Sequence, residues 1–222
     1  MEENIKNNED QKKMANADPA AHETRLSLIS EYIEGTRGNL IKLEKRCLNI
    51  ISDITEAIVE CLLSGKKILI CGNGGSASDA MHIAGELVGR FRMERRALPC
   101  IALNTNAVII TAIGNDYGFE NIFSRQVEAL GASGDLLIGI STSGNSPNVI
   151  KALSAARDIG MKTIGMTGIN GGAMLSKKLC DILLPAPSAV TSQIQEMHIL
   201  CGHIFCKLAE EAIAGGQSDF QK

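Results

Sequence analysis

The chain has 222 residues, of which 45% are hydrophobic, and its 22 Lys and Arg against 25 Asp and Glu give a net charge of −3. This length favours one domain with a single large core, and the charge is not that of a nucleic-acid-binding protein. No apolar run approaches the length of a membrane span, and the polar N-terminus has no signal-peptide pattern. Seven cysteines without a C-x-x-C pair are typical of reduced thiols. We therefore expect a cytoplasmic protein without nucleic-acid or membrane partners.

Residues 1–20 lack hydrophobic periodicity and predict a disordered tail, followed by a single domain over residues 21–222. Between residues 23 and 64, apolar residues recur at intervals of three and four, which predicts amphipathic helices. Gly35 and Gly38 indicate a break that divides this segment into two helices. We expect these helices to pack against a partner subunit.

From residue 65 onward, a strand, turn and helix pattern repeats along the chain. It predicts an α/β fold with a doubly wound, five-stranded parallel sheet flanked by helices. A long C-terminal helix follows, from Thr191 to about Ala214. The expected strands are residues 67–71, 100–103, 135–140, 163–167 and 181–184. Ligands of such sheets bind at the carboxyl ends of the strands.

The turn after the third expected strand, Ser-Thr-Ser-Gly-Asn-Ser at residues 141–146, opens into a helix. The N–H groups and positive dipole end of a helix N-terminus bind anions, so the turn predicts a phosphate site. Hydrogen-bond donors would come from the hydroxyls of Ser141, Thr142, Ser143 and Ser146. Alternatively, it is a plain loop in which Ser146 caps the helix and Pro147 occupies the first helical position.

A second turn of this kind, Cys-Gly-Asn-Gly-Gly-Ser at residues 71–76, follows the first expected strand. Its glycines allow backbone to approach a ligand closely. It matches neither the G-x-G-x-x-G dinucleotide fingerprint nor the G-x-x-x-x-G-K-[ST] phosphate loop. The two turns together predict a crevice for a phosphorylated small molecule.

Reactive groups are predicted on two helices. His82 and Glu86 lie four residues apart on the helix after the second turn, so they share a face. The last helix carries Gln195, His198 and His203 among apolar residues. The simpler interpretations are a solvated His82–Glu86 pair and histidines hydrogen-bonded within a subunit contact. We favour the simpler one for His198.

These motifs, in this order, resemble those of the phosphoheptose isomerases of the sugar isomerase (SIS) domain superfamily. The resemblance runs from Glu23 to the C-terminal helix and rests on several motifs. They are the two turns above, Met-His-Ile-Ala-Gly-Glu-Leu-Val-Gly-Arg-Phe at 81–91, Gly-Asn-Asp-Tyr-Gly-Phe at 114–119, and Ile-Gln-Glu-Met-His at 194–198 followed by His203. It implies a flavodoxin-like SIS fold and conversion of sedoheptulose 7-phosphate to D-glycero-D-manno-heptose 7-phosphate through an enediol. That reaction begins the synthesis of nucleotide-activated heptose precursors.

The resemblance also implies roles for individual residues. Glu86 and His203 would carry the proton transfers, since carboxylate and imidazole suit acid–base catalysis near neutral pH. One Zn²⁺ per subunit would be held by His82, Glu86, Gln195 and His203, although a zinc-bound carboxylate is a poorer base. Substrate contacts would come from Asn73, Gly74, Gly75, Ser76, Asn115, Asp116, Ser141, Thr142, Ser143, Ser146 and Gln195.

Gln195 and His203 are eight residues apart, so a straight helix separates them by roughly 12 Å along its axis. Either Gln195 lies in an irregular first turn, or the helix bends, or the site is shared between chains. We favour a site shared within a homo-oligomer, and the resemblance suggests a tetramer.

Two positions depart from the family pattern: Asn106, where many relatives have Asp, and Ser192-Gln193, where a small residue followed by Arg is commoner. One alternative function is a non-catalytic SIS tetramer that senses sugar phosphates or binds the replication initiator. Such relatives can lose the acid and base, whereas this chain keeps Glu86 and His203. Another is hexosamine phosphate chemistry, which usually involves a duplicated domain, and no internal repeat is present.

Overall fold

The computed structural model describes residues 19–215. The predicted tail at residues 1–20 lies outside this range apart from its last two residues. Contacts divide the chain into two units, Met1–Ile41 and Lys42–Lys222, which we describe separately. The single domain expected over residues 21–222 therefore stays a prediction.

The first described element is one helix, α2 (Pro19–Leu63), and the break expected near Gly35 and Gly38 is absent. Neither glycine has a positive φ angle, so neither takes the left-handed conformation that ends many helices. A glycine inside a helix costs only about 1 kcal/mol, and the Leu, Ile, Lys and Glu residues around these two favour helix. The prediction of two separate helices was wrong.

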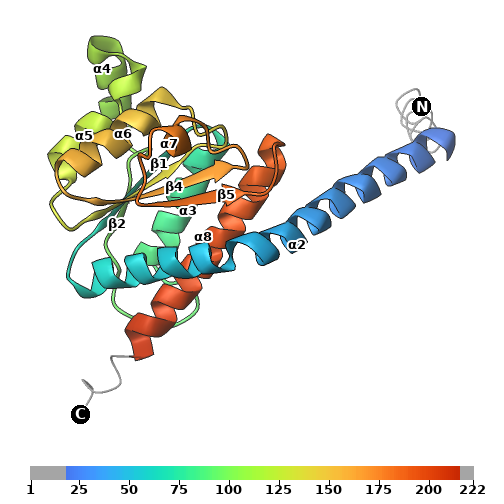
Figure 1. Cartoon of the computed structure of the whole chain (residues 1–222), viewed down its shortest axis with the longest axis horizontal. Helices are drawn as coiled ribbons and strands as arrows, with labels where there is room; N and C mark the ends of the chain where they lie inside the picture. Colours follow the sequence, from blue (N-terminus) through green and yellow to red (C-terminus); the bar gives the residue numbers. More distant parts are fainter. Residues whose placement is uncertain (1–18, 216–222) are drawn as a thin grey trace, which may run out of the picture. The chain divides into compact units, whose positions relative to one another are not determined.

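The sheet in the second unit has five parallel strands in the order β2-β1-β3-β4-β5 (Figure 1). This arrangement confirms the predicted fold class. Strand order reverses between β1 and β3, so their carboxyl ends flank the crevice where such sheets bind ligands. The strands are β1 (Ile68–Gly72), β2 (Cys100–Ala102), β3 (Leu136–Ile140), β4 (Lys162–Gly168) and β5 (Ile182–Ala186).

Helices cover both faces of the sheet (Figure 1). One face packs against α3, α8 and the part of α2 after Ile41, and the other against α5, α6 and α7. The C-terminal helix α8 has the predicted length. The bounds are α3 (Gly75–Val88), α4 (Ala107–Tyr117), the 3₁₀ turn η1 (Phe119–Asn121), α5 (Ser124–Leu130), α6 (Pro147–Asp158), α7 (Gly172–Ser176) and α8 (Thr191–Gly215).

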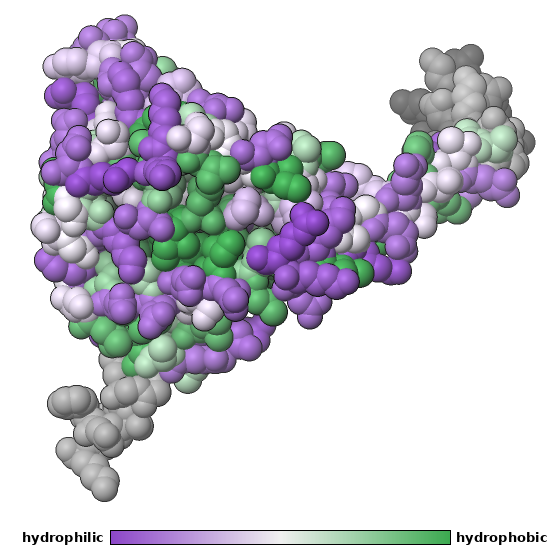
Figure 2. All heavy atoms as spheres, viewed as in Figure 1, coloured by the Kyte–Doolittle hydropathy of each residue, from purple (hydrophilic) through white to green (hydrophobic). Residues whose placement is uncertain are grey.

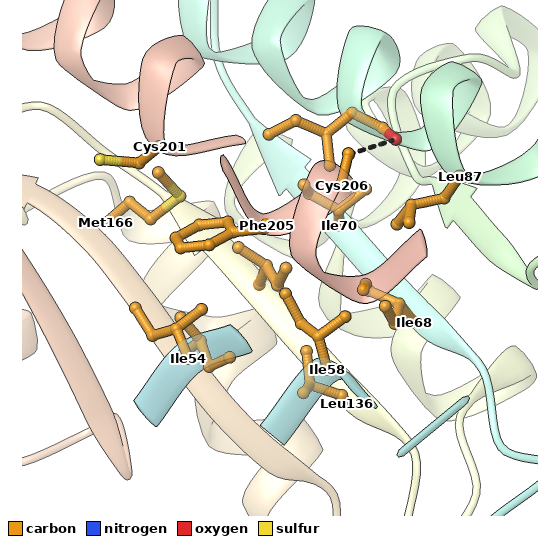
Figure 3. Packing of buried hydrophobic residues seen from close by; sticks show 14 of the residues in the cluster. Ile54, Ile58, Ile68, Ile70, Leu87, Leu136, Met166, Cys201, Phe205 and Cys206 are labelled. Atoms are coloured by element: carbon orange, nitrogen blue, oxygen red, sulfur yellow. Dashed lines mark hydrogen bonds between the residues drawn. The ribbon is translucent and has the colours of Figure 1, made fainter. Parts of the chain in front are cut away.

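Alternating side chains of each strand enter two separate cores. Ile68 and Ile70 of β1 join Phe205 of α8 in the larger core (Figure 3), whereas Leu69 and Cys71 face the other. Burial on both faces explains why the central strands read as continuous apolar runs. The carboxyl ends of the strands then carry the polar turns.

No helix in residues 19–215 is long and apolar enough to cross a membrane. All seven cysteines are free thiols, as the sequence predicted.

Candidate functional site

The predicted phosphate turn leaves β3 and enters α6. Ser141 is buried, and its Oγ lies 2.9 Å from Oγ of Ser146 and 3.5 Å from Oγ of Ser143. Ser146 occupies the N-cap position of α6, but its side chain accepts no capping hydrogen bond. The hydroxyls therefore gather in front of a helix N-terminus, which is the arrangement that suits an anion.

The turn rests closely on the loop before α7. Gly144 has φ +66°, and a Cβ there would lie 2.2 Å from the carbonyl oxygen of Gly171. The backbone N–H of Ala173 donates to Oδ1 of Asn145 over 2.8 Å. Beside this contact is a cavity of about 290 Å³. Its polar lining comes from Thr142, Ser143, Asn145, Asn170, Ser188 and Thr191.

The glycine turn at residues 71–76 lies beside the phosphate turn because β1 and β3 are neighbours. The side-chain amides of Asn73 and Asn148 exchange two hydrogen bonds of 2.9 Å each. Asn148 is in the first turn of α6 and is 2% exposed, so the pair joins the two turns directly. Asn148 was not among the predicted site residues, because its only signal in the sequence is an amide directly after the Ser-Pro that opens the helix.

His82, Glu86 and His203 meet on the packed helices α3 and α8. Nε2 of His82 lies 3.1 Å from Oε1 of Glu86 and 3.4 Å from Nε2 of His203. One ligand atom from each residue falls within 4.8 Å of the others. Residues 121 positions apart in the chain thus form one cluster.

The donor set of this cluster fits a metal ion. Two nitrogens bound to one tetrahedral zinc at about 2.0–2.1 Å lie roughly 3.4 Å apart, and the two imidazole nitrogens have this separation. At most one of the two facing nitrogens can donate a proton to the other, whereas a cation would use both lone pairs. Two imidazoles and a carboxylate are also common zinc ligands.

Gln195, the predicted fourth ligand, lies at one end of the contact between α3 and α8. Its amide packs over Gly75, where a Cβ would come within 2.4 Å of Nε2. Gly75 precedes His82 by seven residues, which is about 10 Å along α3. The amide thus borders the glycine turn, and its metal role stays a prediction.

Asn115 and Asp116, the remaining predicted substrate contacts, lie near the end of α4. Both are exposed, and Nδ2 of Asn115 donates to Oδ1 of Asp116 over 2.8 Å. The helix packs mainly against η1, and Asp116 borders a different cavity of about 430 Å³. The structure therefore places these two residues apart from the cavity beside the phosphate turn.

His198 has a structural environment. It is fully buried, and Nε2 lies 3.1 Å from the carbonyl oxygen of Thr167. Burial lowers the pKa of His198 to about 4, although the hydrogen bond to Thr167 opposes this change. The histidine is therefore neutral at pH 7 and packs within its own chain rather than in a subunit contact.

Comparisons with known proteins give one consistent result. Residues 31–168 match the SIS domain family. The phosphoheptose isomerase of Aliarcobacter butzleri is 60% identical over 190 residues, which are 85% of this chain and 98% of that protein. The solved phosphoheptose isomerase of Francisella tularensis aligns with a TM-score of 0.81 and 40% identity, covering 84% of this chain and 98% of that one.

The chain belongs to the phosphoheptose isomerase family. The solved family member from Neisseria gonorrhoeae is also similar, with a TM-score of 0.78 and 42% identity over 84% of this chain and 98% of that chain. The resemblance stated from the motifs is thereby confirmed.

The two departures from the family pattern have local explanations. Asn106 is the N-cap of α4, and its side chain accepts a hydrogen bond from the N–H of Ile109. Asn and Asp cap helices equally well, so this change keeps the cap. Gln193 accepts a hydrogen bond from the Ser188 hydroxyl over 3.0 Å, beside the cavity.

Asp79 is a further carboxyl near the cluster, one helical turn before His82. It is 9% exposed, and its Oδ2 has no hydrogen-bond partner among the described residues. Burial raises the pKa of Asp79 to about 6, although the charge of His82 opposes this change. Asp79 was not among the site residues predicted from the sequence.

The raised pKa predicts a pH-dependent effect of Asp79→Asn on stability. Between pH 4 and 6 the folded chain binds more protons at Asp79 than the unfolded chain, so this residue makes the free energy of unfolding fall as pH rises. Asn removes the titration, and the stability of the variant relative to wild type should increase by about 1–3 kcal/mol between pH 4 and 7. Chemical denaturation with a chelator present measures the difference.

The matched control is Asp53→Asn, which removes the same carboxylate from an exposed position of α2. His198 contributes the opposite slope, because its lowered pKa makes the unfolded chain bind more protons between pH 4 and 6.5. If the free energy of unfolding of Asp79→Asn relative to wild type stays constant from pH 4 to 7, the raised pKa of Asp79 is contradicted.

Proposed function

We propose that this chain converts sedoheptulose 7-phosphate to D-glycero-D-manno-heptose 7-phosphate, the first step towards nucleotide-activated heptose. One observation carries the proposal: Glu86, His82 and His203 form a cluster in a chain that also has a hydroxyl-lined helix N-terminus. Relatives at 52% and 60% identity named phosphoheptose isomerase support it, and they favour catalysis over a sensing or scaffolding role. The cytoplasmic location inferred from the free cysteines is part of this proposal.

The reaction needs a base and a group that shuttles protons between oxygens. Glu86 takes a proton from C1 of the ketose, which gives an enediol, and returns it to C2 to form the aldose. His203 moves a proton from the hydroxyl oxygen on C1 to the oxygen on C2, which leaves the carbonyl of the aldose at C1. The serine hydroxyls and the N-terminus of α6 hold the phosphate and fix the position of the reacting carbons.

We propose zinc as the metal, held by His82, Glu86 and His203, with Gln195 completing the set. When bound, it supplies a Lewis acid that polarises the carbonyl and stabilises negative charge on the oxygens. His82 contributes to binding and to the orientation of His203 rather than to proton transfer.

We propose that the active form is a homo-oligomer, with a tetramer as the expected size. Leu26, Ile29 and Ile33 of the first unit are each more than half exposed. The second unit has a largely apolar cavity of about 680 Å³ between α2 and α8, and Figure 2 shows hydrophobic residues on the face that carries these helices. Partner copies would cover both surfaces.

The site would then be shared between subunits. The helix α4 has no buried residue despite its apolar sequence, and it carries Asn115 and Asp116. In their own chain these side chains lie apart from the cavity beside the phosphate turn. Asn115 and Asp116 would therefore contribute to the site of a partner subunit. The reactive cluster and these contacts would come from different chains.

Co-expression of two inactive variants tests the sharing. If a Glu86→Gln chain and an Asp116→Ala chain assemble together, about a quarter of the sites should combine an intact Glu86 with an intact Asp116, and activity should return to roughly that extent. If each site uses both residues of one chain, the mixed oligomer stays inactive. A fully active monomer at high dilution would contradict both the oligomer and the shared site.

The test of function is incubation of the purified protein with sedoheptulose 7-phosphate and, separately, with hexose and pentose phosphates. Chromatographic separation of isomers of equal mass should show conversion of the heptulose phosphate alone. Failure to convert any ketose phosphate would exclude the proposed activity.

A further inference from the structure

A buried ion pair joins the loop after α3 to the last helix. Nε of Arg95 lies 3.0 Å from Oε1 of Glu210, and the two side chains are 0% and 1% exposed. Burial alone would raise the pKa of Glu210, but hydrogen bonds from the N–H groups of Arg92, Met93 and Phe91, together with the Arg95 charge, lower it. The carboxylate is therefore charged at pH 7.

Glu210 organises the loop through its backbone. Its carboxylate accepts the N–H of Phe91 at 3.0 Å, of Arg92 at 2.7 Å and of Met93 at 2.8 Å. Three consecutive N–H groups on one carboxylate fix the path of this segment relative to α8. A neutral side chain of similar size could not accept all three bonds as strongly.

Arg95 closes the C-terminal end of α3. Its guanidinium donates to the carbonyl oxygens of Glu86 at 2.9 Å and Leu87 at 3.0 Å, and of Gly89 at 3.3 Å. These carbonyls lie where a helix runs out of internal partners, so the arginine acts as a cap from outside the helix. One of the capped residues is Glu86 itself.

The same arrangement reaches His203. The Phe91 ring, held by the first of the three backbone bonds, lies 5.7 Å from the His203 ring between centroids. Glu210 follows His203 by seven residues, close to two turns, so both project from one face of α8. Arg95 therefore contacts the backbone of Glu86, and Glu210 binds the backbone of Phe91, whose ring lies beside His203.

We propose that Arg95 and Glu210 are positioning residues for the cluster of His82, Glu86 and His203. The pair holds the last turn of α3 and the Phe91 ring in place, and thereby sets the separation of Glu86 from His203 and the orientation of the His203 ring. The kinetic part of this inference rests on the proposed function, whereas the metal-binding part does not.

The experiment compares two variants with wild type. One is Glu210→Gln, and the other is a double variant that combines Arg95→Met and Glu210→Leu. Zn²⁺ affinity is measured by competition with a chromophoric chelator, kcat and KM with sedoheptulose 7-phosphate, and stability by thermal unfolding. We expect Zn²⁺ affinity to fall about tenfold or more, as for other groups that orient metal ligands. We also expect kcat to fall about tenfold while KM changes less than about twofold.

Asp135→Asn is the matched control. Asp135 is 2% exposed and forms an ion pair with Lys67 at the start of β1, away from the carboxyl ends of the strands. The Asp135→Asn variant should have a lower melting temperature than wild type and the same Zn²⁺ affinity. Should a Glu210 variant fail to fold, Phe91→Leu leaves the ion pair intact and still predicts weaker Zn²⁺ binding.

Glu210 variants with wild-type Zn²⁺ affinity and kcat would overturn the inference, because the pair would then serve stability alone. Wild-type protein that binds Zn²⁺ but converts no sugar phosphate would remove the proposed function. The affinity comparison would still decide whether the pair positions the cluster.

Discussion

Replacing Glu86 by Gln should lower kcat for sedoheptulose 7-phosphate by about 10³-fold. The amide has nearly the same shape but cannot take a proton from carbon, and loss of a general base typically costs 10²–10⁴ in rate. Folding should be unaffected, because the side chain is only partly buried, with 25% of its surface exposed. Steady-state kinetics and thermal unfolding measure the two quantities.

The matched control is Glu94→Gln, which removes the same charge from a side chain that is 89% exposed. It should leave kcat unchanged. Because Glu86 is also a proposed metal ligand, exchange of the substrate C1 hydrogen in D₂O should be followed at saturating Zn²⁺. Rapid exchange in Glu86→Gln would show that another group takes the proton.

Much of the fold follows from local pattern. The strands β1 and β3 are buried on both faces, and such strands read as short apolar runs whatever their neighbours. A phosphate site could be predicted at the turns after these strands, because anion binding at a helix N-terminus depends on residues that are adjacent in the sequence. The predicted bounds therefore agree closely with the observed ones.

The cluster could not be found from spacing. His82 and Glu86 are neighbours on one helix, but His203 comes from the other end of the chain, and only the packing of α3 against α8 brings it within 3.4 Å. The family resemblance supplied this pairing. Residue periodicity alone would have left His203 as a histidine within a subunit contact, the interpretation favoured for His198, which instead is buried in its own chain.

The ion pair of Arg95 and Glu210 had no signal in the sequence. Arg95 lies in an arginine-rich segment, and Glu210 stands beside Glu211 on a helix, so both patterns are typical of solvated charges. Burial of the pair depends on how the loop after α3 returns to α8. The predicted helix break at Gly35 and Gly38 was wrong for a different reason. Glycine is unfavourable inside a helix, but the surrounding residues favour helix strongly enough for α2 to continue through both positions.

Gly144→Ala should disable the phosphate turn. The new Cβ would lie 2.2 Å from the carbonyl oxygen of Gly171, at a residue with φ +66°, so the turn must move away from α7. We expect KM for the sugar phosphate to rise at least about tenfold and the free energy of unfolding to fall by about 2–4 kcal/mol. The inhibition constant of inorganic phosphate should rise with KM, because both ligands would use the same N–H and hydroxyl groups.

Gly65→Ala separates the steric effect from the backbone effect. Gly65 has φ +71°, but a Cβ there would meet nothing within 4 Å, so this variant carries only the conformational cost of about 1–2 kcal/mol. Its KM should equal that of wild type. Wild-type inhibition by phosphate in Gly144→Ala would mean that the anion binds elsewhere, because a turn displaced from Gly171 cannot keep the three serine hydroxyls converged in front of α6.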